Sequence, residues 1–168
     1  AYIEYREKYL NAPKLNLDRP VDISLELSSL CNMACVYCYH NDKKNLPFKQ
    51  NIMVPATFKK IVMQAAILGV HSLKFNWRGE STMNPMFRNM TKYARDLATG
   101  STFIDRLTNS NFKFDTNRDD IFEGLSFQTK VKVSYDSFRA EVFEKQRYLG
   151  NHALTTANIE KFYNWPGR

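Results

Sequence analysis

Residues 21–38 read VDISLELSSLCNMACVYC, and this stretch decides the fold of the chain. In its first half, the apolar side chains Val21, Ile23, Leu25 and Leu27 alternate with polar ones. That alternation is the pattern of a β-strand with one buried face. The second half follows without a break and carries every cysteine of the chain. We therefore expect a strand that ends in a cysteine-bearing loop.

Downstream, the apolar pattern switches repeatedly between the helical and the strand period. The order βαβαβαβα predicts a parallel sheet with helices outside it. Right-handed crossovers would curl about four such units into part of a (β/α) barrel, so the expected fold class is α/β. The expected elements are a helix opened by Pro55, a strand over 73–77, a helix after Pro85, a strand over 103–107, a short helix capped by Asn117, a strand over 131–135, and helices over 138–149 and 155–163.

The same pattern suggests how the chain is organised. Residues 1–20 are expected to form an N-terminal leader with a short helix near residues 3–10, and residues 21–163 the partial barrel. Residues 164–168 are expected to be a tail or a truncation point. The chain has 168 residues, which is enough for one domain with its own core.

Composition restricts the classes of protein to consider. No apolar run is long enough to span a membrane. The three cysteines are clustered rather than dispersed, so we expect free thiols in a reducing, cytoplasmic setting instead of a disulfide framework. The net charge of +7 comes from scattered basic residues, which favours a solvated surface over a nucleic-acid site.

The cysteines carry the strongest chemical signal. Cys31, Cys35 and Cys38 offer three thiolates from one short loop, which suits an iron–sulfur cluster that keeps one iron open. The competing reading is a structural zinc site completed by His40. Zinc ligands usually come as two separated pairs, so the cluster reading is favoured.

Polar residues also end the three later strands. They are Arg78-Gly79-Glu80, Thr108-Asn109-Ser110 and Ser134-Tyr135-Asp136. Ligands of parallel α/β sheets bind at the carboxyl ends of the strands. We therefore expect these segments to meet the cysteine loop and to form one site.

The segment Cys31-Asn-Met-Ala-Cys35-Val-Tyr-Cys38 resembles the CxxxCxΦC motif of the radical S-adenosylmethionine (radical SAM) superfamily, with Tyr37 as the aromatic Φ. It is similar in style to the CNLxCxYC form of the peptide- and protein-modifying, SPASM-type branch. The resemblance runs from about Val21 to Tyr163. It implies a partial barrel of about six units, so we expect the last strands and any auxiliary-cluster domain to be missing here.

The resemblance also implies an activity. The three cysteines would hold a [4Fe-4S] cluster, and S-adenosylmethionine would chelate its fourth iron. Reductive cleavage would then give a 5′-deoxyadenosyl radical that abstracts hydrogen from the substrate, here a peptide or protein. A flavodoxin or ferredoxin would supply the electron.

Family motifs assign roles to particular residues. Gly79 and Glu80 match the end of a Gly-Gly-Glu motif that binds the methionine amino group, although Arg78 replaces its first glycine. Arg147 matches an arginine that grips the methionine carboxylate. Asp136 is expected to face the substrate as an acid, a base or a hydrogen-bond acceptor.

The remaining assignments concern the adenosyl part of the ligand. Ser134 is expected at the ribose hydroxyls, and Asn109 at the floor of the pocket. Tyr39 would place its backbone against the adenine, next to Tyr37 of the motif.

The sequence is also compatible with two other functions. One is a non-catalytic binding module that keeps the fold and a structural metal. The other is an RNA-modifying member of the same superfamily.

Overall fold

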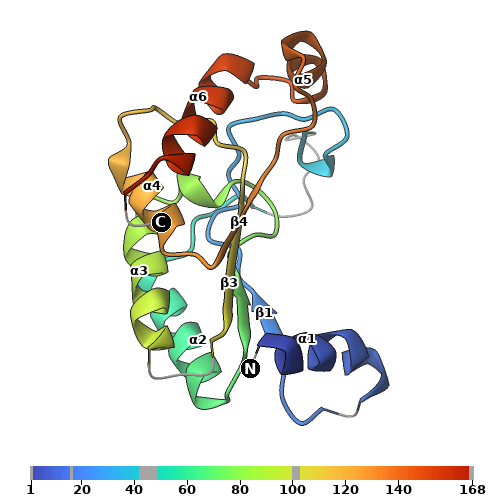
Figure 1. Cartoon of the computed structure of the whole chain (residues 1–168), viewed down its shortest axis with the longest axis vertical. Coiled ribbons are helices and arrows are strands. Elements are labelled where there is room, and N and C mark those ends of the chain that lie inside the picture. Colours follow the sequence, from blue (N-terminus) through green and yellow to red (C-terminus); the bar gives the residue numbers. More distant parts are fainter. Residues whose placement is uncertain (1, 16, 42–48, 100–102, 167–168) are drawn as a thin grey trace.

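The computed structural model describes residues 2–15, 17–41, 49–99 and 103–166. Strands and α-helices alternate along the chain (Figure 1), as the apolar pattern predicts. The elements are α1 (Tyr2–Asn11), β1 (Asp22–Ser24), α2 (Pro55–Ile67), β2 (Ser72–Lys74), α3 (Phe87–Ala98), β3 (Asp105–Ser110), α4 (Asp119–Ser126), β4 (Lys130–Val133), α5 (Ala140–Gln146) and α6 (His152–Tyr163), with 3₁₀ turns at Ala12–Lys14, Tyr39–Asn41 and Ser81–Met83.

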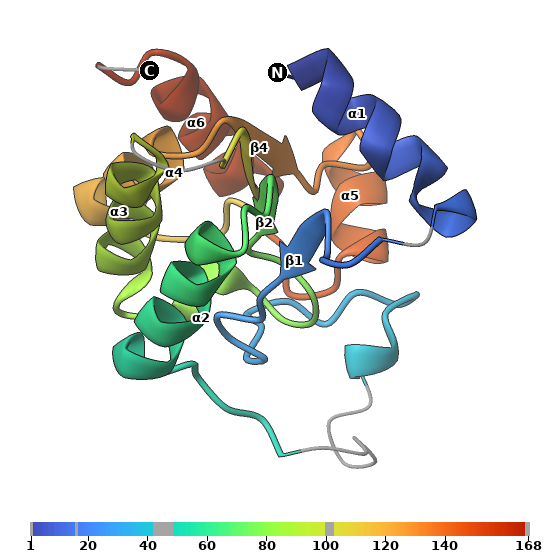
Figure 2. The same ribbon diagram turned by 90° about the horizontal axis from the view of Figure 1, so that it is seen from below.

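The four strands form one parallel sheet in the order β1-β2-β3-β4. Ile23 lies beside Leu73, and Leu73 lies beside Arg106. Seen from below, α2, α3 and α4 lie along one side of the sheet (Figure 2). This arrangement confirms the expected α/β fold with about four βα units.

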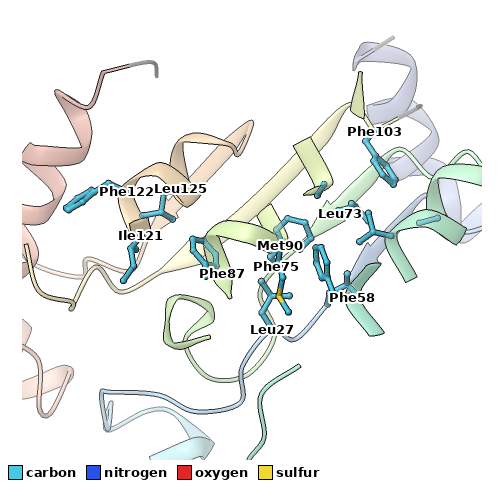
Figure 3. Packing of buried hydrophobic residues seen from close by; sticks show 14 of the residues in the cluster. Leu27, Phe58, Leu73, Phe75, Phe87, Met90, Phe103, Ile121, Phe122 and Leu125 are labelled. Carbon is cyan, nitrogen blue, oxygen red and sulfur yellow. The ribbon is translucent and has the colours of Figure 1, made fainter. Parts of the chain in front are cut away.

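The main core lies between the sheet and these helices (Figure 3). Leu73 and Phe75 pack there with Phe58 of α2 and Met90 of α3, all of them essentially buried. The rings of Phe58 and Phe75 are 5.5 Å apart between centroids. Burying such side chains is the main term that stabilises the sheet against its helices.

The opposite face of the sheet is mostly polar. Val131 packs toward the core cluster, so the alternating neighbours Lys130 and Lys132 lie on the other face. Lys74 forms an ion pair with Asp22 on that face. The sheet therefore has one apolar side, covered by the helices, and one mostly polar side.

All four strands differ somewhat from the expected bounds: β2 ends at Lys74 and β4 at Val133, earlier than expected, and β1 and β3 show the larger changes. β1 ends at Ser24, although the apolar alternation continues to Leu27. Leu25 N–H still donates to the carbonyl of Lys74 in β2, and the residues from Leu27 onward pair with the segment before α2. Met53 N–H donates to the carbonyl of Leu27 at 3.0 Å. β3 extends to Ser110, so the expected turn over 108–110 is part of the strand.

The expected cap of α4 is wrong. The helix begins at Asp119 with Arg118 in the cap position and no side-chain cap. Asp115 organises this turn instead, because its carboxylate accepts from Asn117 N–H at 2.9 Å.

The segments outside the expected barrel also make contacts. The short helix expected near residues 3–10 is present as α1, and its buried Tyr5 stacks on His71 with ring centroids 6.0 Å apart. Trp165 stacks on Phe122 at 5.1 Å. Residues 167–168 of the expected tail lie outside the described residues. None of the described helices has the length and apolar character needed to cross a bilayer.

The packing of the core predicts that truncating two nearby aromatic side chains lowers the free energy of unfolding by different amounts. Phe75 is fully buried, whereas Trp77 is 73% exposed. Phe75→Ala should lower the free energy of unfolding by about 3–5 kcal/mol, because it leaves a cavity against α2. Trp77→Ala, the matched control, should change it by less than about 1 kcal/mol. Urea denaturation measures both, and equal costs would contradict this packing.

Candidate active site at the strand ends

The expected site segments lie at one end of the sheet. The cysteine segment and α5 lie at the carboxyl ends of the strands, and α1 lies at the opposite end (Figure 1). Parallel strands place their carboxyl ends along one edge, so Gly79, Ser110 and Ser134 follow or end neighbouring strands there. The expectation that these motifs share one region is consistent with the topology.

The three cysteines face one apolar cluster. Cys31, Cys35 and Cys38 are free thiols that pack with Phe143 of α5 and with Tyr135 after β4. Burial raises the pKa of the Cys31 thiol, and Glu80 and the neighbouring thiols add to the effect. Thiolates in this cluster therefore need compensating positive charge from a metal or a cation.

The chemistry of the donor set fits an iron–sulfur cluster, because such clusters are held by cysteine thiolates. Cys31, Cys35 and Cys38 are free thiols from one loop that share one apolar cluster. Among the described residues, no group of three or more cysteine, histidine, aspartate or glutamate side chains is arranged to hold a single metal ion.

Gly79 seats the cysteine segment on β2. Its φ is +63°, a left-handed conformation that favours glycine. A Cβ at this position would lie 2.5 Å from the carbonyl oxygen of Ser28 and 2.6 Å from that of Leu30. Only glycine therefore lets the end of β2 approach the residue before Cys31 this closely.

Arg78, which departs from the family pattern, has a partner of its own. Its Nε donates to Glu26 at 2.6 Å and its Nη2 at 2.9 Å, which is a two-point grip on one carboxylate. Glu26 follows β1, so the pair ties the ends of the first two strands together. The left-handed residue of this turn is Gly79, which leaves position 78 free to carry a side chain.

Glu80 is committed to hydrogen bonds within the protein. Its side chain is buried, and its two oxygens accept from Thr82 Oγ1 at 2.8 Å and from Asn111 N–H at 2.8 Å. Burial raises the pKa of this carboxyl, against hydrogen bonds from Asn111 and Thr82 that favour the ionised form. Glu80 thus joins the ends of β2 and β3, and its role toward a ligand stays a prediction.

Sequence reasoning missed a second clamp on the cysteine segment. Asn111 Nδ2 donates to Asn32 Oδ1 at 2.7 Å, and Lys113 Nζ donates to the carbonyl of Asn32 at 2.9 Å. Asn32 lies between the first cysteine and Met33. Asn111 and Lys113 alternate with phenylalanines directly after the third strand, and no sequence motif points to their contacts with Asn32.

Asp136 and Arg147 form an ion pair beside the cysteines. Arg147 Nε lies 2.7 Å from Asp136 Oδ2, and its Nη2 donates to Oδ1 at 2.9 Å. Tyr37 Oη donates to Asp136 Oδ2 at 2.7 Å. Arg147 Nη1 also donates to Cys35 Sγ at 3.6 Å. The structure thus brings four of the sequence-predicted site residues into one chain of contacts.

Electrostatics within this group follow from those contacts. Partial burial opposes ionisation of Asp136, but hydrogen bonds from Arg147 and Tyr37 outweigh it and lower its pKa. Burial, followed by the hydrogen bond to Asp136, raises the pKa of Tyr37 well above its usual value. At neutral pH the group therefore holds an anionic Asp136, a cationic Arg147 and a neutral Tyr37.

Three further predicted residues, Asn109, Ser134 and Tyr39, make other contacts. Ser134 Oγ donates to Asn109 Oδ1 at 3.3 Å, and both side chains belong to the polar side of the sheet. Tyr39 is exposed and begins a 3₁₀ turn, with its ring edge-on to His40. No contact between Tyr39 and the pair Asn109–Ser134 is found in the described part of the chain.

Comparison with known proteins bears on the fold. No protein-family model and no curated protein sequence matches the chain. Among solved structures, anSMEcpe with bound AdoMet matches with a TM-score of 0.68 and 22% identity over 86% of this chain and 41% of that one. Methylornithine synthase (PylB) matches with a TM-score of 0.59 and 10% identity, over 85% of this chain and 41% of that one.

A third structure, BtrN in complex with AdoMet and 2-DOIA, has a TM-score of 0.56 and 17% identity over 83% of this chain and 56% of that one. These are radical SAM enzymes, so the chain has the fold of part of a radical SAM barrel. It spans about two fifths of the length of the first two chains it matches.

The close contact of Gly79 with the backbone before Cys31 predicts that adding a single methyl group at this position destabilises the chain. Gly79→Ala should lower the free energy of unfolding by about 1–3 kcal/mol through backbone strain, with a further cost from the carbonyls it meets. Gly69→Ala, the control, has a similar φ of +68° at the end of α2. Chemical denaturation should show the larger loss for Gly79→Ala, and equal losses would contradict the close approach.

The lowered pKa of Asp136 predicts how its pairing depends on pH. A depressed carboxyl pKa contributes stability that is present above its ordinary value of 3.8 and is lost as pH falls through the folded-state value. Asp136→Asn should therefore destabilise the chain at pH 7, and the difference from wild type should shrink as pH falls below 3.8. Unfolding curves across pH test this, and a difference independent of pH would argue against the ion pair.

Proposed function

We propose that this chain is a radical SAM enzyme or the cofactor-binding portion of one. The single observation that carries the proposal is the packing of three free thiols, at Cys31, Cys35 and Cys38, into one apolar cluster at the strand ends. The shared fold with enzymes whose structures contain AdoMet supports it. The chain covers 41% of anSMEcpe, so the activity of a whole enzyme is part of the proposal.

The three thiolates would hold a [4Fe-4S] cluster. The chemistry that such a cluster supplies is one-electron reduction of the sulfonium of S-adenosylmethionine, which yields methionine and a 5′-deoxyadenosyl radical. The protein would keep the thiols together: Gly79 and Glu80 hold the start of the loop, and Phe143 excludes water from its inner side.

The protein groups around the cluster suit a zwitterionic ligand with an adenosyl group. Asn109 and Ser134 offer hydrogen-bonding groups on the polar side of the sheet, where we propose the ribose binds. Arg147 already pairs with the carboxylate of Asp136, through a hydrogen bond from Nη2 and an ion-pair contact of Nε, so a ligand carboxylate would compete with Asp136 for this guanidinium. Glu80 would hold the turn after β2 in place through its hydrogen bonds to Thr82 and Asn111.

For the substrate, we propose a peptide or protein. The support is the style of the cysteine motif, together with exposed aromatic side chains near the strand ends, among them Tyr37 and Trp77. A flavodoxin or ferredoxin is the proposed electron donor, and an acidic protein of this kind would suit a chain with a net charge of +7.

The proposal predicts cleavage of S-adenosylmethionine. After anaerobic reconstitution with iron and sulfide and reduction with dithionite, the chain should convert added S-adenosylmethionine to 5′-deoxyadenosine, measured by liquid chromatography. Cys35→Ala should reduce iron loading and lower product formation at least about tenfold, since it removes one of the three ligands. Trp77→Ala is a control at the same end of the sheet, and it should retain the iron.

Two outcomes would contradict the proposed enzyme, and a third would contradict only the proposed peptide or protein substrate. Tight binding of zinc with no uptake of iron would favour a structural metal site. An iron-loaded chain that forms no 5′-deoxyadenosine would favour a non-catalytic binding module. Retention on RNA at physiological salt would instead support an RNA-modifying enzyme.

A further inference from the structure

We propose that Arg147 raises the reduction potential of the cluster through its contact with Cys35, and that Asp136 limits this effect. The inference rests on the proposed function, because it assumes that Cys35 ligates an iron–sulfur cluster. It assigns to Arg147 a task beyond binding of a ligand carboxylate. Arg147 would act through the cysteine ligand and would not touch the substrate.

The guanidinium of Arg147 is held in place. Arg147 is 9% exposed, although arginine is rarely buried without a partner. Its neighbours in the chain pair with the cysteine segment: Ala34 N–H donates to the carbonyl of Tyr148 at 2.8 Å, and Val36 N–H donates to that of Gln146 at 3.0 Å. These two bonds flank Cys35 on one segment and Arg147 on the other.

The guanidinium is oriented so that one of its nitrogens faces a cysteine sulfur. Nε and Nη2 face Asp136, which leaves Nη1 pointing at Cys35 Sγ, 3.6 Å away. The ring of Tyr37 lies beside the guanidinium, with 5.7 Å from Cζ to the ring centroid, and its hydroxyl anchors Asp136. The side chain is therefore restrained by several contacts in the position from which it donates to sulfur.

The charges of Arg147 and Asp136 set the direction in which each of them shifts the reduction potential. One-electron reduction makes the cluster and its thiolates one unit more negative, and the electron comes from the external reductant. A cationic donor at a ligating sulfur stabilises the more negative state and so raises the potential. The carboxylate of Asp136 has the opposite sign and partly cancels the charge of Arg147. Removing each partner in turn should therefore move the potential in opposite directions.

The experiment is a redox titration of the cluster-loaded chain without S-adenosylmethionine. The reduced cluster is quantified by electron paramagnetic resonance at set potentials, and iron and sulfide contents are measured for every variant. Arg147→Gln should make reduction at least about tenfold less favourable, a shift of about 59 mV to more negative potential. Asp136→Asn keeps an oxygen acceptor for Nη2 and should shift the potential to more positive values.

A matched control separates this effect from a general change of charge. Arg118 is exposed and donates to Asp120 through two hydrogen bonds of 2.7 Å, so it too is paired with an aspartate, but it makes no contact with a thiol among those found. Arg118→Gln should leave the potential unchanged. A purely structural role of Arg147 would change cluster content or stability without opposite shifts of potential in the two site variants.

The outcomes are distinguishable. Opposite shifts in Arg147→Gln and Asp136→Asn support the inference, whereas unchanged potentials or shifts in one direction overturn it. If Arg147→Gln fails to hold the cluster, Asp136→Asn alone tests the inference: a more positive potential supports it, and an unchanged or more negative potential overturns it. Failure of the wild-type chain to assemble any cluster would overturn the proposed function itself.

Discussion

The close backbone contact between Gly79 and the residues before Cys31 is the constraint on which the rest of the site depends. It fixes the end of β2 against the carbonyls of Ser28 and Leu30, and Glu80 N–H then donates to Leu30 at 2.7 Å. Side-chain bonds from Glu80 reach the end of β3. The cysteine loop is thus attached to a rigid sheet instead of projecting freely.

The loop is held from its other side by a more distant part of the chain. Backbone bonds to residues 146–148 and the contact between Arg147 and Cys35 attach it to the end of α5. Phe143 of the same helix packs with the three cysteines in one apolar cluster. Three positions on one loop are therefore supported by two independent elements, which is the kind of preorganisation that a cofactor site requires.

The sequence pattern predicts the fold well where periodicity is local. The order of strands and helices, the apolar face of α2 and the grouping of the cysteines all follow from spacing over a few residues. It fails where a distant segment takes part, as when residues 51–53 pair with residues 27–29 beyond the end of β1. The partners of Arg78 and Arg147 were also not predicted, because ion pairs between separate elements leave no periodic signal.

The central claim is that the three cysteines bind a [4Fe-4S] cluster with one iron free for S-adenosylmethionine. Mössbauer spectroscopy of the reconstituted, isotopically enriched chain tests it most directly. The account predicts a cubane cluster in which one iron site changes its parameters when S-adenosylmethionine is added. Iron that forms no cubane, or a cubane whose sites all ignore the added ligand, would contradict it.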